Sequence, residues 1–199
     1  AYSSYEKKQL DESGNPVHTS YCNPTTAEFR TTLSDNILAQ YDAAMKQIAG
    51  AEDDVALVIA GNGPLEQEVK QATSHSVYYV GPLAPADISS LFASSDIFCL
   101  PTEYPEGLPT VLLEAASQNN AIVVSNCAGA KEVIPDDSYG TILSSTAPND
   151  IAEAILRYVR NPKEREEASV KVNHHIAHAF SWDATASKVV RLIDESLHK

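Results

Sequence analysis

The chain has 199 residues, 43% of them hydrophobic, and a formal net charge of −13 at pH 7. This length suits one well-packed α/β domain and is short for two, while the apolar content excludes disorder of the whole chain. Because the charge is strongly negative, the sequence as a whole has no basis for binding nucleic acid or an anionic membrane.

The cysteines and the start of the chain bear on its cellular setting. The three cysteines are far apart and have no metal-ligand spacing, which indicates reduced thiols. No apolar run reaches membrane-spanning length, and no signal peptide precedes the first predicted strand. The chain begins with Ala1 rather than Met. We therefore expect an excised part of a longer protein that is cytoplasmic, or that lies at the membrane surface when complete.

The N-terminal part of the chain is the least regular. Residues 1–16 form a polar segment with a turn cluster at its end, and residues 17–199 are predicted to form a single domain. A weak first strand is expected at residues 17–22. A helix follows, because apolar residues recur at helical spacing up to Gly50, which ends it. Those apolar residues are Leu33, Ile37, Tyr41, Met45 and Ile48.

Strands and helices alternate through the rest of the chain. Continuous apolar runs at residues 55–60, 96–100 and 121–124 are typical of parallel strands buried on both faces, and shorter strands are predicted at 77–80 and 139–143. The alternation predicts the α/β class, with a doubly wound, Rossmann-like parallel sheet of about six strands in three α/β/α layers.

The loops that follow these strands carry the candidate site. Doubly wound sheets bind ligands at the carboxyl ends of their strands, so the loops at Gly61, Gly81, Glu106 and Gly129 should share one edge. Beyond them, a last helix begins near Trp182, and we expect its apolar stripe to lie on the domain with Trp182 as its anchor.

We expect the main functional residues to lie at residues 99–118, which read CLPTEYPEGLPTVLLEAASQ. Seven residues separate Glu106 from Glu114 in this stretch. Pro109 can occupy a first helical turn, so that the free amides of residues 110 and 111 point into the loop and favour an anion. Gly107 lets a ligand approach the backbone. The carboxylate of Glu114 lies in an apolar run, where it is costly unless a group such as a pair of sugar hydroxyls satisfies it.

The segment PEGLPTVLLEAAS resembles the signature of family 4 glycosyltransferases of the GT-B fold, in their C-terminal, donor-binding domain. The resemblance implies that this chain is the donor-binding domain, at residues 17–199, of a retaining enzyme. Such an enzyme transfers a sugar from a nucleotide sugar to a glycan or lipid-linked acceptor. It further implies that Glu106 is catalytic, beside the donor sugar, and that Glu114 binds the ribose hydroxyls. The implied donor-binding residues are Gly107, Leu108, Pro109, Thr110, Val111, Glu114, Arg30, Gly61, Leu83 and Gly129.

Three of these residues, and Lys131 near Gly129, have a second interpretation. The Arg and Lys with which the family grips the donor diphosphate are absent, and Arg30 is the only cation between residues 19 and 40. It either replaces the family's Lys or is a solvated residue at a helix start. Gly61 could contact phosphate or only make a tight turn, and Leu83 could pack on the nucleotide base or in the core. Gly129 would bend the loop beside the donor, where Lys131 serves phosphate or is solvated.

The expected partners are a nucleotide-sugar donor and a missing N-terminal acceptor domain, with no nucleic acid and no transmembrane segment. His174 and His178 are one turn apart and could share a metal. No carboxylate or cysteine completes the set, so exposed histidines are favoured, and we expect no metal and no cofactor. Two rivals remain: a nucleotide-sugar epimerase, which lacks this Glu spacing, and a non-catalytic sugar-nucleotide-binding or interaction module, which the absent Arg/Lys loop favours.

Overall fold

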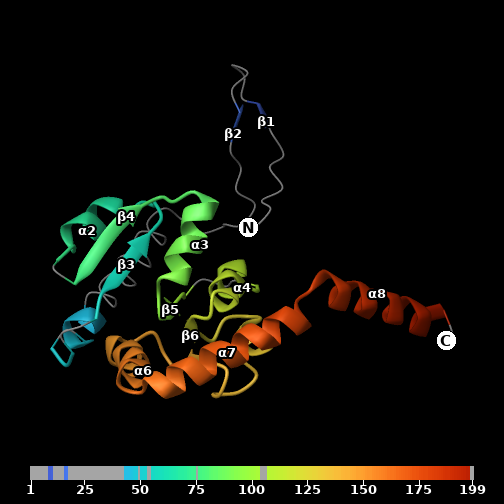
Figure 1. Cartoon of the computed structure of the whole chain (residues 1–199). Helices are drawn as coiled ribbons and strands as arrows, with labels where there is room; N and C mark the ends of the chain where they lie inside the picture. The colour runs from blue at the N-terminus through green and yellow to red at the C-terminus, as the bar shows by residue number, and fades with distance from the viewer. Residues whose placement is uncertain are drawn as a thin grey trace.

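The computed structural model describes residues 9–10, 16–17, 43–48, 50–52, 55–74, 76–103 and 107–197 (Figure 1). Residues 43–48 are helical. The remaining elements, in chain order, are β1 (Gln9–Leu10), β2 (Pro16–Val17), β3 (Leu57–Ala60), α2 (Glu66–Gln71), β4 (Val77–Gly81), α3 (Pro85–Ala93), β5 (Ile97–Leu100), α4 (Thr110–Ser117), β6 (Ala121–Ser125), α5 (Ala130–Val133), β7 (Thr141–Leu143), α6 (Pro148–Arg160), α7 (Pro162–Ala179) and α8 (Trp182–Leu197).

The strands of the main body pair only in parallel. β3 pairs with β4, and β5, β6 and β7 form a second parallel sheet in that order. Ile97 lies opposite Ala121, and Val123 lies opposite Thr141. Parallel neighbours need a crossover connection, which here is a helix or a longer loop. The predicted α/β class and the parallel pairing of its apolar strands are therefore confirmed.

β6 is the centre of the core, and all five of its residues are buried. Val123 belongs to one apolar cluster together with Tyr158 of α6, while Val124 belongs to a second cluster together with Leu112 of α4 and Val172 of α7. Successive side chains of a strand point to opposite faces, so helices cover both sides of this sheet. Complete burial of one such aliphatic side chain contributes about 1.5–3 kcal/mol.

β3 and β4 depart from the predicted burial. Leu57 and Ile59 of β3 pack against the first apolar cluster, but Val58 on the other face is 38% exposed. Tyr78 and Val80 of β4 are 49% and 46% exposed. The prediction that residues 55–60 are buried on both faces is therefore wrong, because the described helices cover only one face of this pair.

The predicted first strand is not seen as such. Val17 lies in β2, which pairs antiparallel with β1, and residues 18–22 lie outside the described part of the chain. The structure thus describes five parallel strands, β3 to β7, where about six were expected from the alternation of elements. The doubly wound arrangement does not depend on the sixth.

The C-terminal helices differ in how they pack. α6 and α7 bury apolar residues against the sheet, whereas α8 buries none and extends beyond α7 (Figure 1). Trp182 is 89% exposed. The prediction that the stripe of this helix lies on the domain with Trp182 as its anchor is therefore wrong. None of the described helices combines the length and the apolar content that crossing a bilayer requires.

Candidate functional site

The loop between β5 and α4 carries the motif around Pro109. Pro109 is buried and extended, with φ −64° and ψ 115°, and it is the N-cap of α4, so the helix begins one residue later than predicted. Its carbonyl accepts a hydrogen bond from the amide of Leu112 at 3.0 Å. Gly107 and Leu108 are half-buried beside it. Glu106 lies outside the described residues, so its predicted catalytic position stays a prediction.

Glu114 lies on the open face of α4. The helix buries Leu112, Ala115 and Ala116, whereas Thr110 and Glu114 are both exposed. Residues four apart in a helix lie one above the other, so Glu114 sits directly over the first turn. Within the described residues its carboxylate has no hydrogen-bond or ion-pair partner. The expected desolvation cost is therefore absent, and the carboxylate remains available to a ligand.

Gly129 joins the loop after β6 to the loop after β5. It has φ +80° and forms the N-cap of α5, and the predicted bend at this glycine is thus present. A Cβ atom added to Gly129 would lie 2.9 Å from the Leu108 Cβ and 3.0 Å from its Cα. The structure thereby brings together two predicted site residues that are far apart in sequence.

Two polar residues that the sequence analysis did not select fix the strand ends. The Ser125 hydroxyl, at the end of β6, donates to the Thr102 carbonyl at 2.6 Å, which ties the loop after β5 to β6. The fully buried Asn120 side chain donates to the Phe92 carbonyl at 2.9 Å and to the Ser95 carbonyl. A polar residue bordering a buried apolar strand is the signal that could have identified both.

Gly61 and Leu83 lie at the carboxyl ends of β3 and β4. The Gly61 amide donates to the Gly81 carbonyl at 2.8 Å, and the Tyr79 hydroxyl donates to the Gly61 carbonyl at 2.7 Å. Both glycines have positive φ, and Leu83 is half-buried. These loops belong to a sheet that shares no strand pairing with β5–β7 in the described residues. Arg30 lies outside the described part.

The titratable groups near the strand ends do not form a nucleophilic centre. Burial raises the pKa of the Cys99 thiol in β5 to about 12, so this thiol stays protonated at neutral pH. Hydrogen bonds from the Ser145 and Ser144 hydroxyls lower the pKa of Asp150 at the start of α6. On α7, the Nε2 atoms of His174 and His178 are 3.1 Å apart, and within the described chain no third histidine, cysteine or carboxylate joins them.

Residues 40–174 match the model of the family described as glycosyl transferases group 1, which covers more than half of the chain. The chain belongs to this family. A curated relative is the phosphatidyl-myo-inositol mannosyltransferase of Mycobacterium leprae, which is 26% identical over 144 residues. That match covers 71% of this chain and 38% of the relative. The chain spans less than half the length of the curated relatives that it matches most strongly.

Solved structures share the fold of this chain. The C-terminal domain of a glycosyl transferase group 1 protein, LpcC from Francisella tularensis, aligns with a TM-score of 0.63 at 20% identity, covering 76% of this chain and 82% of that one. Anabaena Alr3699/HepE in complex with UDP aligns with a TM-score of 0.68 at 16% identity, covering 79% of this chain and 44% of that one. At these identities the likeness establishes the fold, which is that of GT-B glycosyltransferases.

Proposed function

We propose that this chain is the donor-binding domain of a retaining glycosyltransferase, which moves a sugar from a nucleotide sugar to a glycan or lipid-linked acceptor. The observation that carries the proposal is the exposed Glu114 carboxylate one turn into α4, at the carboxyl edge of the parallel sheet. This carboxylate has no partner among the residues that the structure describes. Ligands of doubly wound sheets bind at that edge. The LpcC domain, of similar extent, and the UDP complex of HepE support a donor-binding role.

In this proposal, different residues bind different parts of the donor. The first turn of α4 presents backbone amides and the positive end of its dipole, which suit a diphosphate. Glu114 accepts hydrogen bonds from the ribose hydroxyls on the same helix face, and Gly107 lets the donor approach the backbone. Gly129 leaves room for Leu108 in the loop beside the donor. Glu106 stands beside the sugar. Such a site positions the donor and stabilises the departing diphosphate.

A calorimetric titration of the chain with UDP, GDP and ADP tests the proposal, because the sequence motif does not distinguish the bases. Binding of one nucleotide, weakened by Glu114→Gln, supports a donor site at α4. Absence of binding with all three nucleotides contradicts it.

The alternative function is a non-catalytic sugar-nucleotide-binding or interaction module. One observation favours it: Arg30 is the only cation between residues 19 and 40, where the resembled family has both an Arg and a Lys. Nucleotide binding by the chain, combined with no sugar transfer by the complete protein, would support this alternative.

A further inference from the structure

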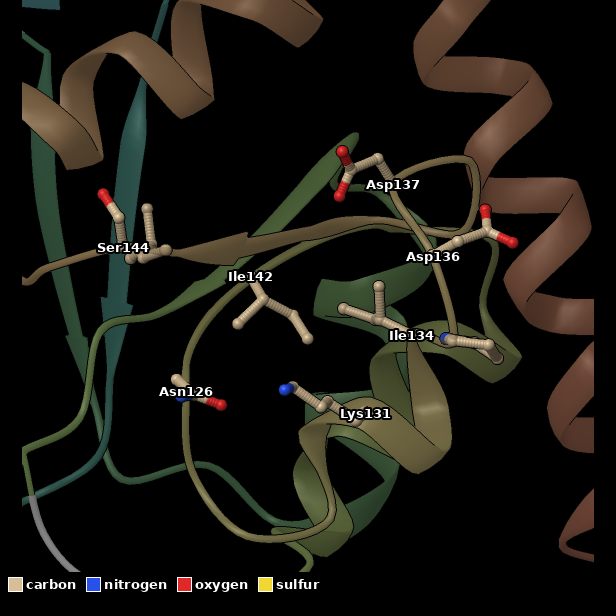
Figure 2. A pocket seen from close by; sticks show the side chains of 9 residues that line it. Asn126, Lys131, Ile134, Asp136, Asp137, Ile142 and Ser144 are labelled. Atoms are coloured by element: carbon tan, nitrogen blue, oxygen red, sulfur yellow. The ribbon is translucent and has the colours of Figure 1, made fainter.

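A separate cavity of about 390 Å³ opens at the carboxyl ends of β6 and β7. Its lining comes from the end of β6, from α5 and the turn after it, and from β7 with the residue that follows (Figure 2). The lining residues are Asn126, Lys131, Ile134, Pro135, Asp136, Asp137, Ile142, Leu143 and Ser144. Of these residues, the sequence analysis gave a possible role beside the donor only to Lys131, which was expected to serve phosphate or to be solvated. The volume falls within the range of small-molecule sites.

Three exposed polar side chains, those of Lys131, Asn126 and Asp137, line this cavity. Figure 2 shows the Lys131 side chain reaching from α5 toward Asn126, with Ile134 and Ile142 between these two residues and Asp137. Within the described residues, neither Lys131 nor Asn126 has a hydrogen-bond or ion-pair partner. Asp137 likewise makes no hydrogen bond there. The ammonium of Lys131 and the carboxamide of Asn126 thus lie on one side of the cavity, and the carboxylate of Asp137 lies on the other.

The other polar groups of the lining are already engaged. Asp136 accepts hydrogen bonds from the Ser138 amide at 2.9 Å and from its hydroxyl, which lower the pKa of this carboxyl group. The Ser144 hydroxyl donates to the Asp150 carboxylate at 2.8 Å. A ligand would therefore meet Lys131, Asn126 and Asp137 first, above an aliphatic floor.

This combination suits a neutral sugar ring better than an anion. A hydroxyl group both donates and accepts hydrogen bonds, so hydroxyls on opposite sides of one ring can accept from an ammonium and donate to a carboxylate. The aliphatic floor offers contact to the C–H face of a ring. A phosphate would meet a single cation and two carboxylates, Asp136 and Asp137. α5 has only four residues and adds no dipole of consequence.

We propose that this cavity, the Lys131 pocket, binds one hexose ring through Lys131, Asn126 and Asp137, separately from the donor loop. The proposal rests on the proposed function, because a glycosyltransferase whose acceptor or product is a glycan can hold one of its sugars outside the cleft between the two domains. The pocket would then hold a sugar of the acceptor or product while the donor occupies α4.

Amide chemical shifts of the ¹⁵N-labelled chain test this assignment, with methyl glucoside, methyl mannoside and methyl galactoside added in turn and inorganic phosphate as the anion probe. We expect at least one hexoside to shift the amides of residues 126, 131, 134 and 142. Lys131→Met and Asn126→Ala should each weaken this binding about tenfold. Lys188→Met is the matched control, because Lys188 lies exposed on α8 and should leave binding unchanged.

Several outcomes would overturn the Lys131 pocket as a sugar site: shifts confined to residues 107–114, shifts caused by phosphate and by no hexoside, or no shift with any probe. A separate titration of each variant with UDP, GDP and ADP distinguishes this failure from failure of the donor site. Unchanged nucleotide affinity in Lys131→Met supports two separate sites. Weakened nucleotide affinity would assign Lys131 to the donor site and overturn the proposal.

Discussion

Gly129 lies against Leu108 so closely that a Cβ atom on the glycine would come within 2.9 Å of the Leu108 Cβ. Gly129 also has φ +80°, a conformation that side chains disfavour. Gly129→Ala should therefore destabilise the fold by about 1–3 kcal/mol, since backbone strain and overpacking act together. Urea unfolding measures the change.

The matched control for this substitution is Gly63→Ala. A Cβ atom on Gly63 would meet nothing within 4 Å, and its φ lies outside the left-handed region. This variant should keep the unfolding free energy within about 0.5 kcal/mol. Equal stability of the Gly129 and Gly63 variants would show that the loops after β5 and β6 do not pack in solution as described.

Glu114→Gln tests the nucleotide site without disturbing the fold. The carboxylate is exposed and unpartnered within the described residues, so its loss should leave stability unchanged. A hydrogen bond to a charged group contributes about 1.5–3 kcal/mol, so nucleotide affinity should fall about tenfold or more by calorimetry. Glu153→Gln, on an exposed position of α6, is the control. Unchanged affinity in the Glu114 variant would remove it from the donor site.

Glu106→Gln should separate binding from transfer. The resemblance implies that Glu106 lies beside the sugar rather than the nucleotide, so in the complete protein the variant should keep its nucleotide affinity and lose turnover. Steady-state transfer kinetics and a nucleotide titration of the same preparation measure the two effects. A variant that loses nucleotide binding but keeps its turnover per bound donor would contradict this assignment.

The free energy of unfolding should depend on pH through the buried Cys99 thiol. Burial raises its pKa from 9.0 to about 12. Because the folded-state value lies above the unfolded one, its contribution to stability is present below about pH 9 and is lost as the pH rises toward 12. At mildly alkaline pH, a disulfide reagent should modify Cys99 far more slowly in the native chain than in urea. Native Cys99 reacting as fast as Cys99 in urea would contradict the desolvation of its thiol.

The local sequence predicted β6 well, because residues 121–124 form an apolar run that only a doubly covered strand can bury. Residues 96–100 were also expected to be buried on both faces, but Asp96 is exposed and β5 is only half-buried. The local sequence did not predict the open face of α4. Val111 and Leu113 precede Glu114 in the apolar run but are only half-buried. Leu112, Ala115 and Ala116 form the buried stripe. Periodicity within one short helix leaves the orientation of that stripe undetermined.

The local sequence patterns did not predict contacts between residues that are distant in the chain. The motif selected both Leu108 and Gly129, yet nothing in their local patterns shows that they touch. Val58 has the apolar character of a core residue, and its exposure depends on which helices cover β3. Trp182 is a further case, since an apolar helix stripe does not specify the surface that it packs on. These features depend on tertiary packing rather than on propensity.

The last prediction is that these 199 residues bind a donor but do not transfer its sugar. The match to the mannosyltransferase from M. leprae covers 38% of that relative, and the described part of the chain has five parallel strands, β3 to β7. A GT-B enzyme, as the resemblance implies, places its active site between two such domains, and their closure excludes water and aligns the acceptor.

With the donor in an open cleft, turnover should be slow hydrolysis at most. The measurement adds UDP-, GDP- and ADP-sugars one at a time to the chain alone, and follows both binding and product in the presence of sugar acceptors. The complete protein is the positive control. Efficient transfer by the chain alone would show that one domain suffices. Neither binding nor transfer with any of these donors would favour the non-catalytic module, because a donor-binding domain must at least hold its nucleotide.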